Sequence, residues 1–451
     1  MLSEAELAPF ASGELAKTLG PLLYAPNGVG ELRPHALAPL VWATLHHAQD
    51  VPYWSERMPD EGDLAPLDWL AKIPSVRRDD LDRQRQDFLS PRSTFAFCSF
   101  TSSTSTGRSL LIERGREEAL YIRNFFAVMQ ARRPQPALKG LGLQAVNINH
   151  GDLLSAGGSS GYSFPVNLYV ATGYATAANL LTQDFTWPGW ERRIGSLNGS
   201  FSCLYRLARY MDHHGYELED GQLLSAVAFA SPIPPAARDY LQGRFGTRLH
   251  DNYSMTEAFG SAAYCDECDG YHMAPFIWDE VLDTDEDRPV ADGEVGELTI
   301  TPLFPFAQRF VLLRYRTGDL AVRFKSICKR GGQAIRLLGR KRNAVRLADG
   351  GWVGSIPVAS ALFDEAELHR PENNIEIDGD RTCGEFPWMK LSSNEVGDKA
   401  YLDIAPTFGA NSDSARMQSI VDRILDRLPD LPLEVRAQPL ETLSTGGTWK
   451  L

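Results

Sequence analysis

The sequence predicts an α/β fold that extends over more than one domain. A chain of 451 residues exceeds the size of one ordinary domain. Apolar, strand-like runs such as 223–229 are followed by helical segments such as 235–245. Such alternation predicts a parallel sheet whose strands are joined by crossover helices. Toward the C-terminus, short strands at 402–404 and 433–435 flank a capped amphipathic helix at 412–428, which predicts a small α+β domain.

The composition is that of a globular protein with a large core, since 43% of the residues are hydrophobic and 23% are charged. The net charge of −13, from 45 basic and 58 acidic residues, argues against nucleic acid or an anionic membrane as the main partner. Residues 1–10 contain Glu4 and Glu6 rather than a basic segment, and no unbroken apolar run could span a bilayer. We therefore expect a cytoplasmic protein, and its six scattered cysteines do not suggest a disulfide framework.

The predicted elements follow in chain order. The pattern is largely helical over 15–89, an apolar strand covers 95–100, a strand resumes at Leu110 and Leu111, and amphipathic helices follow at 116–130 and 200–211. The segment 235–245 begins with proline, which the first turn of a helix tolerates. Glycine-rich stretches, notably 157–161, could line an acyl pocket or could be ordinary connections between strands and helices.

The first stretch with chemical potential is Arg314-Tyr315-Arg316-Thr317-Gly318-Asp319-Leu320. A strand at 293–301 precedes it, and 311–315 is predicted to be a second strand that delivers Thr-Gly-Asp to a tight bend. A rigid Asp319 carboxylate could accept hydrogen bonds from the vicinal hydroxyls of a ribose, because both of its oxygens are acceptors. Taken alone, the three residues are better explained as a polar hairpin turn.

The second stretch is a hydroxyl-rich loop directly after the strand at 95–100. Polyphosphate binding needs backbone N–H groups, hydroxyls and a nearby cation. The loop offers these groups through Ser102, Ser103, Ser105, Thr106, Gly107 and Arg108. A solvated Ser/Thr linker is the alternative interpretation.

The third stretch is Asn252-Tyr253-Ser254-Met255-Thr256-Glu257. The Tyr253 ring could stack on a purine, and the Thr256 hydroxyl could hold an α-phosphate. The Glu257 carboxylate could reach Mg²⁺, which prefers hard oxygen ligands. An isolated peptide of this length would otherwise be an ordinary loop.

Taken together and in this order, the three stretches resemble the signature of the adenylate-forming enzymes, most closely the phenylacetate–coenzyme A ligase branch. The hydroxyl-rich loop resembles the family's Ser-Ser-Gly-Thr-Thr-Gly-Lys-Pro, with Thr104, Arg108 and Ser109 in place of glycine, lysine and proline. The third stretch resembles Tyr-Gly-(Leu/Met)-Thr-Glu, with Ser254 in place of glycine. The resemblance implies a large N-terminal domain with parallel sheets and a β-barrel-like subdomain, followed by a small α+β lid.

The resemblance also implies roles for individual residues. Asp319 would hold the ribose, Thr256 and the 102–108 loop the phosphates, and Glu257 the Mg²⁺. Ser231, Asn252 and Tyr253 would complete the nucleotide site. Catalysis would then come mainly from positioning and electrostatics.

The domain boundary and the catalytic lysine follow from the same resemblance. Residues 337–343 resemble the family's Gly-Arg-x-Asp-Asp hinge, which gives domains 1–338 and 339–451 and places Arg340 against the nucleotide. The family ends with a lysine that assists adenylation. Here Lys450 is the only lysine of the tail, and an unengaged terminal lysine is the alternative.

The activity implied is that of a ligase. ATP, Mg²⁺ and a carboxylic acid, for which an aromatic acid is one candidate, would give an acyl-adenylate and pyrophosphate. A thiol such as CoA, or an amine, would then take the acyl group. The departures at Thr104, Ser254, Arg342 and the tail leave two alternatives, a degenerate member that binds without turnover and a biosynthetic ligase with an unusual acceptor.

The cysteines suggest a separate metal site. Cys265, Cys268, His272 and the distant Cys328 could supply four ligands to a tetrahedral structural zinc, as in several relatives of this branch. Plain thiols are the equal alternative, because one Cys-x-x-Cys is a modest signal. Cys98, Cys203 and Cys383 are predicted to be small core residues.

Overall fold

The computed structural model describes residues 12–24, 29–100, 109–131, 141–146, 162–187, 190–191, 193–373, 375–409 and 413–444. The chain forms two compact units. Unit 1 comprises Met1–Lys139, Asn149–Ser160 and Tyr253–Leu337, and unit 2 comprises Gly140–Ile148, Gly161–Asn252 and Leu338–Leu451. The chain passes from unit 1 to unit 2 for the last time at 337–338. The C-terminal segment, residues 338–451, therefore belongs to the same unit as residues 161–252. The division into domains 1–338 and 339–451 stays a prediction.

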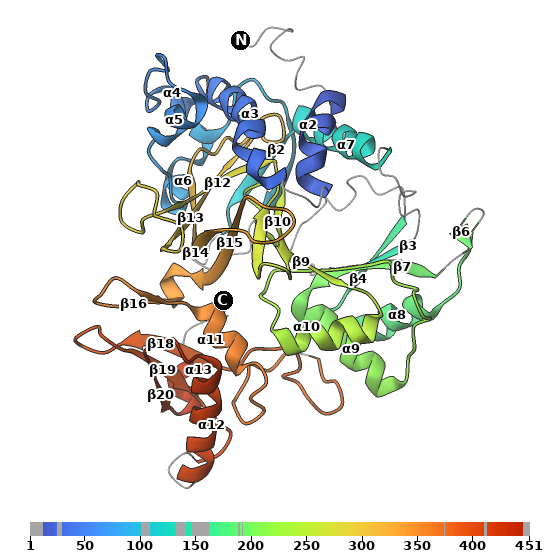
Figure 1. The fold of residues 1–451 in the computed structure, drawn as a ribbon. Helices are drawn as coiled ribbons and strands as arrows, with labels where there is room; N and C mark the ends of the chain where they lie inside the picture. The colour runs from blue at the N-terminus through green and yellow to red at the C-terminus, as the bar shows by residue number, and fades with distance from the viewer. Residues whose placement is uncertain are drawn as a thin grey trace. The chain divides into compact units, whose positions relative to one another are not determined.

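Unit 1 begins with the predicted helical region (Figure 1). Its helices are α2 (Ser12–Tyr24), η2 (Val29–Leu32), α3 (Arg33–Ala48), α4 (Pro52–Ser55), α5 (Pro66–Ala71), α6 (Arg78–Gln84) and η3 (Arg85–Phe88). An antiparallel pair follows, β1 (Phe95–Phe100) and β2 (Leu111–Gly115), and leads into α7 (Arg116–Ala131). The predicted strands and the helix at 116–130 are therefore confirmed.

The rest of unit 1 is an antiparallel sheet. Its strands are β10 (Ser261–Cys265), β11 (Gly270–Met273), β12 (Ile277–Leu282), β13 (Val295–Pro302), β14 (Tyr315–Lys325) and β15 (Gln333–Arg340), in the order β12-β13-β14-β15-β11-β10. Strand β15 crosses into unit 2 at its last residues. This sheet corresponds to the part that the resemblance described as a barrel-like subdomain.

The structure corrects one element of the prediction. Residues 311–314 are not a strand, and β14 begins only at Tyr315, so Thr317-Gly318-Asp319 lies inside a strand rather than at a bend after one. The register against β13 shifts between Glu297 and Thr299, which marks a β-bulge opposite this segment. Gly318 has φ 78°, in the left-handed region that favours glycine. A bulge explains the pattern because it turns a polar side chain without ending the strand.

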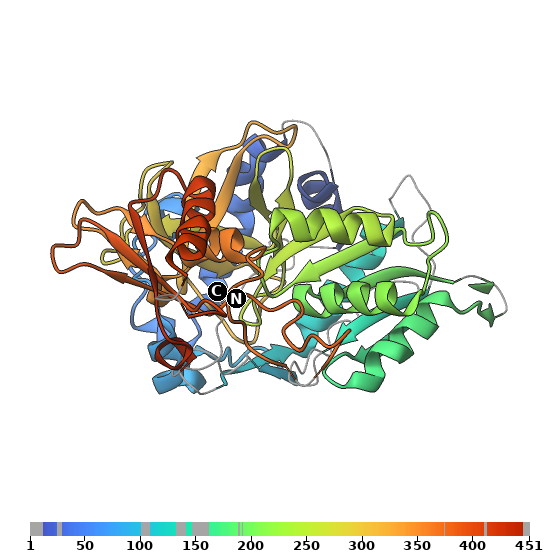
Figure 2. The ribbon, with the colours of Figure 1, turned by 90° about the horizontal axis from the view of Figure 1, so that it is seen from below.

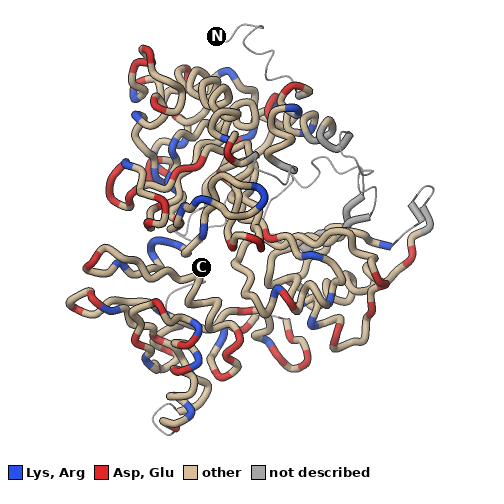
Figure 3. Tube along the Cα trace, in the orientation of Figure 1, with Lys and Arg blue, Asp and Glu red and all other residues tan. Residues whose placement is uncertain are grey.

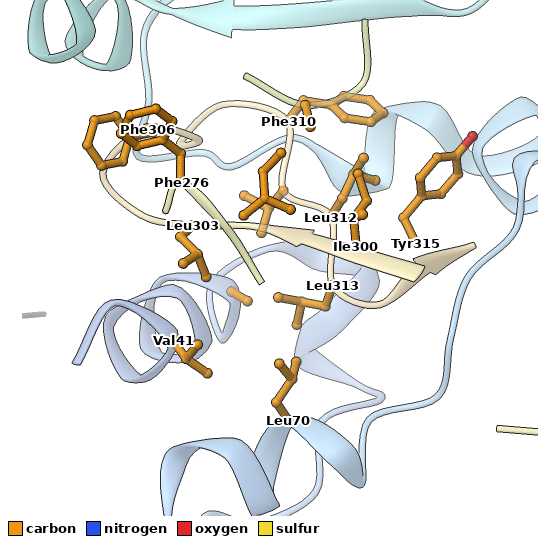
Figure 4. Close-up of a cluster of buried hydrophobic side chains, with 14 of the residues drawn as sticks. Val41, Leu70, Phe276, Ile300, Leu303, Phe306, Phe310, Leu312, Leu313 and Tyr315 are labelled. Carbon is orange, nitrogen blue, oxygen red and sulfur yellow. The ribbon is translucent and has the colours of Figure 1, made fainter. Parts of the chain in front are cut away.

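The core of unit 1 joins the N-terminal helices to this sheet. Figure 4 shows side chains from α3 and α5 and from the segments around β13 and β14 in one cluster. Aromatic rings dominate the part around Phe306, whose ring lies 4.5 Å from that of Phe276 and 5.2 Å from that of Phe125. Burial of these rings, rather than helix propensity alone, holds the helical region on the sheet.

Unit 2 contains the predicted parallel sheet. Its strands are β3 (Leu141–Val146), β4 (Tyr162–Asn167), β7 (Ile194–Ser200), β8 (Ser225–Phe229) and β9 (Leu249–Ser254), in the order β9-β8-β7-β3-β4, and β9 ends in unit 1. Each neighbouring pair is parallel. Helices α8 (Ala171–Thr182), α9 (Phe201–His214) and α10 (Pro235–Phe245) lie side by side along the sheet in Figures 1 and 2. The short strands β5 (Thr186–Trp187) and β6 (Trp190–Glu191) pair with each other.

The C-terminal segment of unit 2 carries the predicted small α+β part. Its elements are η5 (Lys341–Asn343), β16 (Val345–Arg346), β17 (Trp352–Val353), α11 (Ser355–Leu362), β18 (Met389–Ser393), β19 (Ala400–Ile404), α12 (Ser414–Arg427), β20 (Leu433–Ala437) and α13 (Leu440–Ser444). Strands β18, β19 and β20 form a sheet of their own. Helix α12 begins after Asp413, whose side chain accepts a hydrogen bond from the Arg416 N–H as an N-cap.

The segment between α11 and β18 packs on the parallel-sheet part of the same unit. Phe363 packs against Phe201 of α9, with the two rings tilted and their centroids 5.7 Å apart. Arg206 of α9 donates to the Cys383 carbonyl over 2.9 Å and pairs with Glu385. The C-terminal segment therefore contributes to the core under the parallel sheet as well as to its own small core.

The charges and cysteines complete the description of the fold. Figure 3 shows Asp and Glu interspersed with Lys and Arg along the described trace. None of the helices in the described ranges is long and apolar enough to cross a membrane. Cys203 and Cys383 are buried as predicted, whereas Cys98 in β1 is only half-buried because it lies on a two-stranded pair.

Replacing Phe306 by alanine tests the core of unit 1. The side chain is fully buried among aromatic rings, so Phe306→Ala should lower the free energy of unfolding by about 3 to 5 kcal/mol through the cavity it leaves. Chemical denaturation followed by tryptophan fluorescence measures the change. Phe95→Ala, at a side chain that is 51% exposed, is the matched control and should unfold like the natural protein.

Candidate functional site

A buried ion pair joins the two signature runs of unit 1. The guanidinium of Arg316, on β14, donates to the Glu297 carboxylate of β13 over 3.1 Å, and both side chains are almost fully buried. Arg77 adds a second cation to Glu297 at 3.1 Å. Arg316 also donates to the carbonyls of Asp283 and Glu286. The Gly-Glu-x-Gly-Glu and Arg-Tyr-Arg runs therefore form two sides of one network.

Arg314 anchors the entry to β14. Its guanidinium makes a bidentate pair with Glu280 of β12, with both N–O distances 3.2 Å, and donates to the Ile73 carbonyl over 2.6 Å. Its backbone has φ 47°, which is unfavourable for a residue with a side chain. Burial raises the pKa of Glu280, and Arg314 opposes that shift. Such a strained position is stable only when its surroundings over-determine it, and this network does so.

The bulge presents Asp319 to Tyr253. The Tyr253 hydroxyl donates to Asp319 Oδ2 over 2.6 Å. The Asp319 N–H donates to the Thr317 hydroxyl oxygen over 3.1 Å, and that hydroxyl donates to the Leu298 carbonyl over 2.9 Å. Two residues predicted from separate stretches are thus brought into direct contact. An ionised carboxylate has further acceptor positions, so Asp319 can bind a hydroxyl of a ligand in addition to Tyr253.

Thr256 and Glu257 follow Tyr253 in the chain and also belong to unit 1. The Tyr315 hydroxyl lies 3.3 Å from Glu257 Oε1 and donates to it. Arg78 Nη1 lies 4.0 Å from the same oxygen. The Thr256 carbonyl accepts a hydrogen bond of 2.7 Å from Arg114. The sequence did not single out Arg78 or Arg114, because both are distant in the chain and neither belongs to a motif.

The remaining described site residues belong to unit 2. Ser231 lies two residues after the end of β8, and Asn252 lies in β9, where it is paired with Phe229 of β8. Both are therefore at the carboxyl ends of adjacent parallel strands, where ligands bind in open α/β sheets. Arg340 ends β15 at the start of η5. Ser102, Ser103, Ser105, Thr106, Gly107, Arg108 and Lys450 lie outside the described residues.

The predicted metal ligands come together in unit 1. The ligand atoms of Cys265, Cys268, His272 and Cys328 all lie within 4.8 Å of one another. His272 Nε2 is 3.4 Å from the sulfurs of both Cys268 and Cys328. A tetrahedral zinc with its usual bond lengths separates its ligand atoms by about 3.5 to 3.8 Å. The spacing and the sulfur-rich donor set therefore fit a structural zinc ion.

The pKa values of the predicted metal ligands shift in different directions, since burial raises that of Cys268 to about 12, whereas those of His272 and Cys328 are lowered. Burial, with Arg330 nearby, lowers the pKa of His272 to about 4, so its imidazole is neutral at pH 7. Burial alone would raise the pKa of Cys328, but hydrogen bonds from the Ser326 hydroxyl and from backbone N–H groups lower it below its usual value. A neutral imidazole and an ionised thiolate are the forms that coordinate zinc.

Comparison with known proteins supports the resemblance. No family model matches the chain. Over 312 residues the chain is 26% identical to the phenylacetate–coenzyme A ligase of Pseudomonas putida, and the match covers 65% of this chain and 66% of that enzyme. Against the phenylacetate–coenzyme A ligase of Escherichia coli (strain K12) the identity is 24% over 332 residues, covering 69% of this chain and 72% of the enzyme. The chain is a relative of the phenylacetate–coenzyme A ligases.

Solved structures of the adenylate-forming enzymes share the fold. A 2-hydroxyisobutyryl-CoA ligase in complex with 2-HIB-AMP aligns with a TM-score of 0.64, 18% identity, and 94% of this chain and 89% of that chain covered. An open conformation of the same ligase, in complex with 2-HIB-AMP and CoA, aligns with a TM-score of 0.62 and 17% identity, covering 92% of this chain and 89% of that chain. The predicted α/β fold class is therefore confirmed for this chain.

The dependence of stability on pH tests the contacts of Asp287 with Ser75 and Arg316. Burial would raise the pKa of Asp287, but hydrogen bonds from Ser75 and Arg316 prevail and lower it to about 2. Because the folded pKa lies below the unfolded value near 4, the carboxylate stabilises the fold above pH 4 and the effect is lost between about pH 4 and 2.

Asp287→Asn should therefore weaken the loss of thermal stability between pH 4 and 3. Thermal unfolding at several pH values measures the slope. Asp285→Asn, on the same loop, is the control and should keep the natural slope. Equal slopes in all three proteins would contradict the assignment of Asp287 to the network.

Proposed function

We propose that this chain is an AMP-forming ligase that activates a carboxylic acid with ATP and transfers the acyl group to CoA or to another thiol or amine. The observation that carries the proposal is the Tyr253–Asp319 hydrogen bond, which lies in the same unit as Thr256 and Glu257. Four residues that the resemblance assigns to ATP or its Mg²⁺ are held there by part-buried hydrogen bonds. The identity to phenylacetate–coenzyme A ligases supports the same reaction class.

In the first step a carboxylate oxygen of the acid attacks the α-phosphorus of ATP, and pyrophosphate leaves. Asp319 would accept hydrogen bonds from the ribose hydroxyls. The hydrogen bond to Asp319 fixes the Tyr253 hydroxyl and so holds its ring for stacking against the base. Thr256 would hold the α-phosphate with its hydroxyl. These groups act by positioning the nucleotide in line with the acid.

Glu257 would supply a carboxylate to Mg²⁺, which neutralises charge on the phosphates when it is bound. The carboxylate oxygens are the hard ligands that this ion prefers. Glu257 Oε1 already accepts a hydrogen bond from Tyr315, which orients the side chain, and lies 4.0 Å from Arg78. The loop residues Ser102, Ser103, Ser105, Thr106, Gly107 and Arg108 would bind the other phosphates, with Ser231, Asn252 and Arg340 at the rest of the nucleotide and Lys450 at the developing charge.

In the second step a thiol or amine attacks the acyl carbonyl, and AMP leaves. CoA is the acceptor that the relatives' names favour. The 2-hydroxyisobutyryl-CoA ligase structure that contains both 2-HIB-AMP and CoA supports this order of steps. An aromatic acid is the first candidate substrate, since both phenylacetate–coenzyme A ligases take one by name.

Acid-dependent exchange of ATP with pyrophosphate tests the proposal. The natural protein should incorporate labelled pyrophosphate into ATP in the presence of an aryl acid and Mg²⁺, because adenylation is reversible. A panel of aryl, aliphatic and amino acids then defines the substrate class. Exchange with no acid, despite measurable ATP binding, would contradict the proposal and favour a degenerate member that binds without turnover.

Two variants separate binding from turnover. Asp319→Ala should abolish nucleotide binding, because it removes the ribose acceptor. Lys450→Ala should lower the exchange rate and leave the ATP affinity unchanged if this lysine assists adenylation. An unchanged rate in Lys450→Ala would identify the tail lysine as unengaged.

We also propose that Cys265, Cys268, His272 and Cys328 hold a structural zinc ion. The mutual approach of the four ligand atoms supports this choice over plain thiols. Zinc there would join the β10–β11 hairpin to the loop between β14 and β15, both in unit 1. Its effect would be on stability rather than on the reaction.

Metal analysis and thermal unfolding check this site. The purified protein should contain one zinc ion per chain, and prolonged chelation should lower its unfolding temperature, because binding energy contributes directly to folding. Cys328→Ser should lose the metal and unfold at a similarly reduced temperature. Cys203→Ser, a buried cysteine outside the cluster, should keep its zinc. Full zinc content in Cys328→Ser would contradict the ligand set.

A further inference from the structure

A buried arginine contacts the backbone of the third stretch. Arg114 lies on β2, which within the described residues forms a two-stranded sheet with β1, and its side chain is 4% exposed. Its Nη2 donates to the Thr256 carbonyl over 2.7 Å. Thr256 and Arg114 are 142 residues apart in the chain, so no local pattern could reveal this contact.

A buried glutamate holds Arg114 in turn. Glu118, in the first turn of α7, is 1% exposed, and its Oε1 lies 3.8 Å from Arg114 Nη1. Its Oε2 accepts hydrogen bonds from the backbone N–H groups of Gln308 and Arg309, over 2.6 and 2.8 Å. Glu118 is therefore fixed by the loop before β14, and Arg114 is fixed between Glu118 and Thr256.

This pair is poorly explained by stability alone. Burying two charges is costly, and well-packed apolar residues of similar volume are often as stable or more so. Within the described ranges, Arg114 Nε and Glu118 Oε1 are buried without a hydrogen-bond partner, which adds to that cost. Apolar residues could not replace the two backbone hydrogen bonds that Glu118 accepts, nor the hydrogen bond from Arg114 to the Thr256 carbonyl, and only the latter reaches the third stretch.

Fixing that carbonyl fixes the peptide group that leads into Glu257. The Glu257 side chain is itself held by the Tyr315 hydroxyl at 3.3 Å and faces Arg78 at 4.0 Å. A carboxylate that coordinates Mg²⁺ must lie within a few tenths of an ångström of the right place, because this ion demands near-ideal octahedral geometry. The backbone position of Glu257 is therefore part of the Mg²⁺ site that the proposed function requires.

We propose that Arg114 is a positioning residue for the Mg²⁺ of bound MgATP, acting through the Thr256 carbonyl on the carboxylate of Glu257. This inference rests on the proposed function, since it assigns Mg²⁺ to Glu257. Arg114 does not touch the nucleotide in this role. It determines how well the metal ligand is placed, as the outer contacts of metal ligands do in other proteins.

Nucleotide binding by calorimetry, with Mg²⁺ and with EDTA, tests the proposal. Arg114→Met removes the charge and the hydrogen bond while keeping an unbranched side chain that can fill the space. It should weaken MgATP binding about tenfold and leave binding of Mg²⁺-free ATP unchanged, because only the metal contact is disturbed. A purely structural role would change both affinities together or neither of them.

The matched control is Arg206→Met in unit 2. Arg206 is also buried, pairs with a glutamate and donates to a backbone carbonyl, but that carbonyl belongs to Cys383. This variant should show the natural affinities with and without Mg²⁺. If Arg114→Met does not fold, Glu118→Gln keeps the volume and removes one charge, and should show a smaller selective loss of MgATP affinity.

The outcomes separate this inference from the proposed function. Equal affinities in Arg114→Met and the natural protein, or equal losses with and without Mg²⁺, overturn the positioning role while the natural protein's acid-dependent exchange still supports the ligase. A selective loss of MgATP affinity in a protein that shows no exchange supports the positioning role and contradicts the ligase. A natural protein that binds no MgATP overturns both.

Discussion

The pair between Arg316 and Glu297 is the interaction on which the rest of the candidate site depends. It joins β13 to β14 at the bulge, and both side chains are almost completely buried. Each charge has further partners, since Arg77 also pairs with Glu297 and Asp287 also pairs with Arg316, and such additional contacts offset the cost of burying the pair. The pair therefore fixes the register on each side of Gly318, and that register points Asp319 toward Tyr253. The nucleotide-binding chemistry proposed for Asp319 follows from a constraint on its neighbours rather than from Asp319 itself.

Buried ion pairs in unit 1 hold the backbone segments that carry the candidate site residues. Arg314 with Glu280 holds the start of β14 and a strained backbone. Arg114, paired with Glu118, holds the backbone directly before Glu257, the proposed ligand of Mg²⁺. The candidate carboxylates of Asp319 and Glu257 accept hydrogen bonds from the hydroxyl groups of Tyr253 and Tyr315. Carboxylates held in this way suit the proposed nucleotide site, because preorganised groups need not rearrange when a charged ligand binds.

The cores explain why the two units do not coincide with two consecutive stretches of sequence. The residues before β18 pack their aromatic side chains on α9, so the C-terminal segment belongs to the unit that contains the parallel sheet. The polypeptide enters unit 1 at β9 and leaves it along β15, both of which are continuous strands. The Arg206–Glu385 pair also joins α9 to the C-terminal segment within unit 2.

The α/β class, most of the helices and strands, and the candidate site residues were predictable from the sequence, because periodicity and turn residues act locally. The helix at 235–245 and the Cys/His set show how far such patterns reach. Tertiary structure alone decided that Thr-Gly-Asp lies at a bulge inside a strand, since a bulge depends on the register of the partner strand. It also decided that Arg114 serves Thr256, because a contact across 142 residues leaves no trace in local spacing. Residues that form a local motif can be recognised in the sequence. The residues that hold such a motif in place, such as Arg114, are brought to it by packing between distant segments.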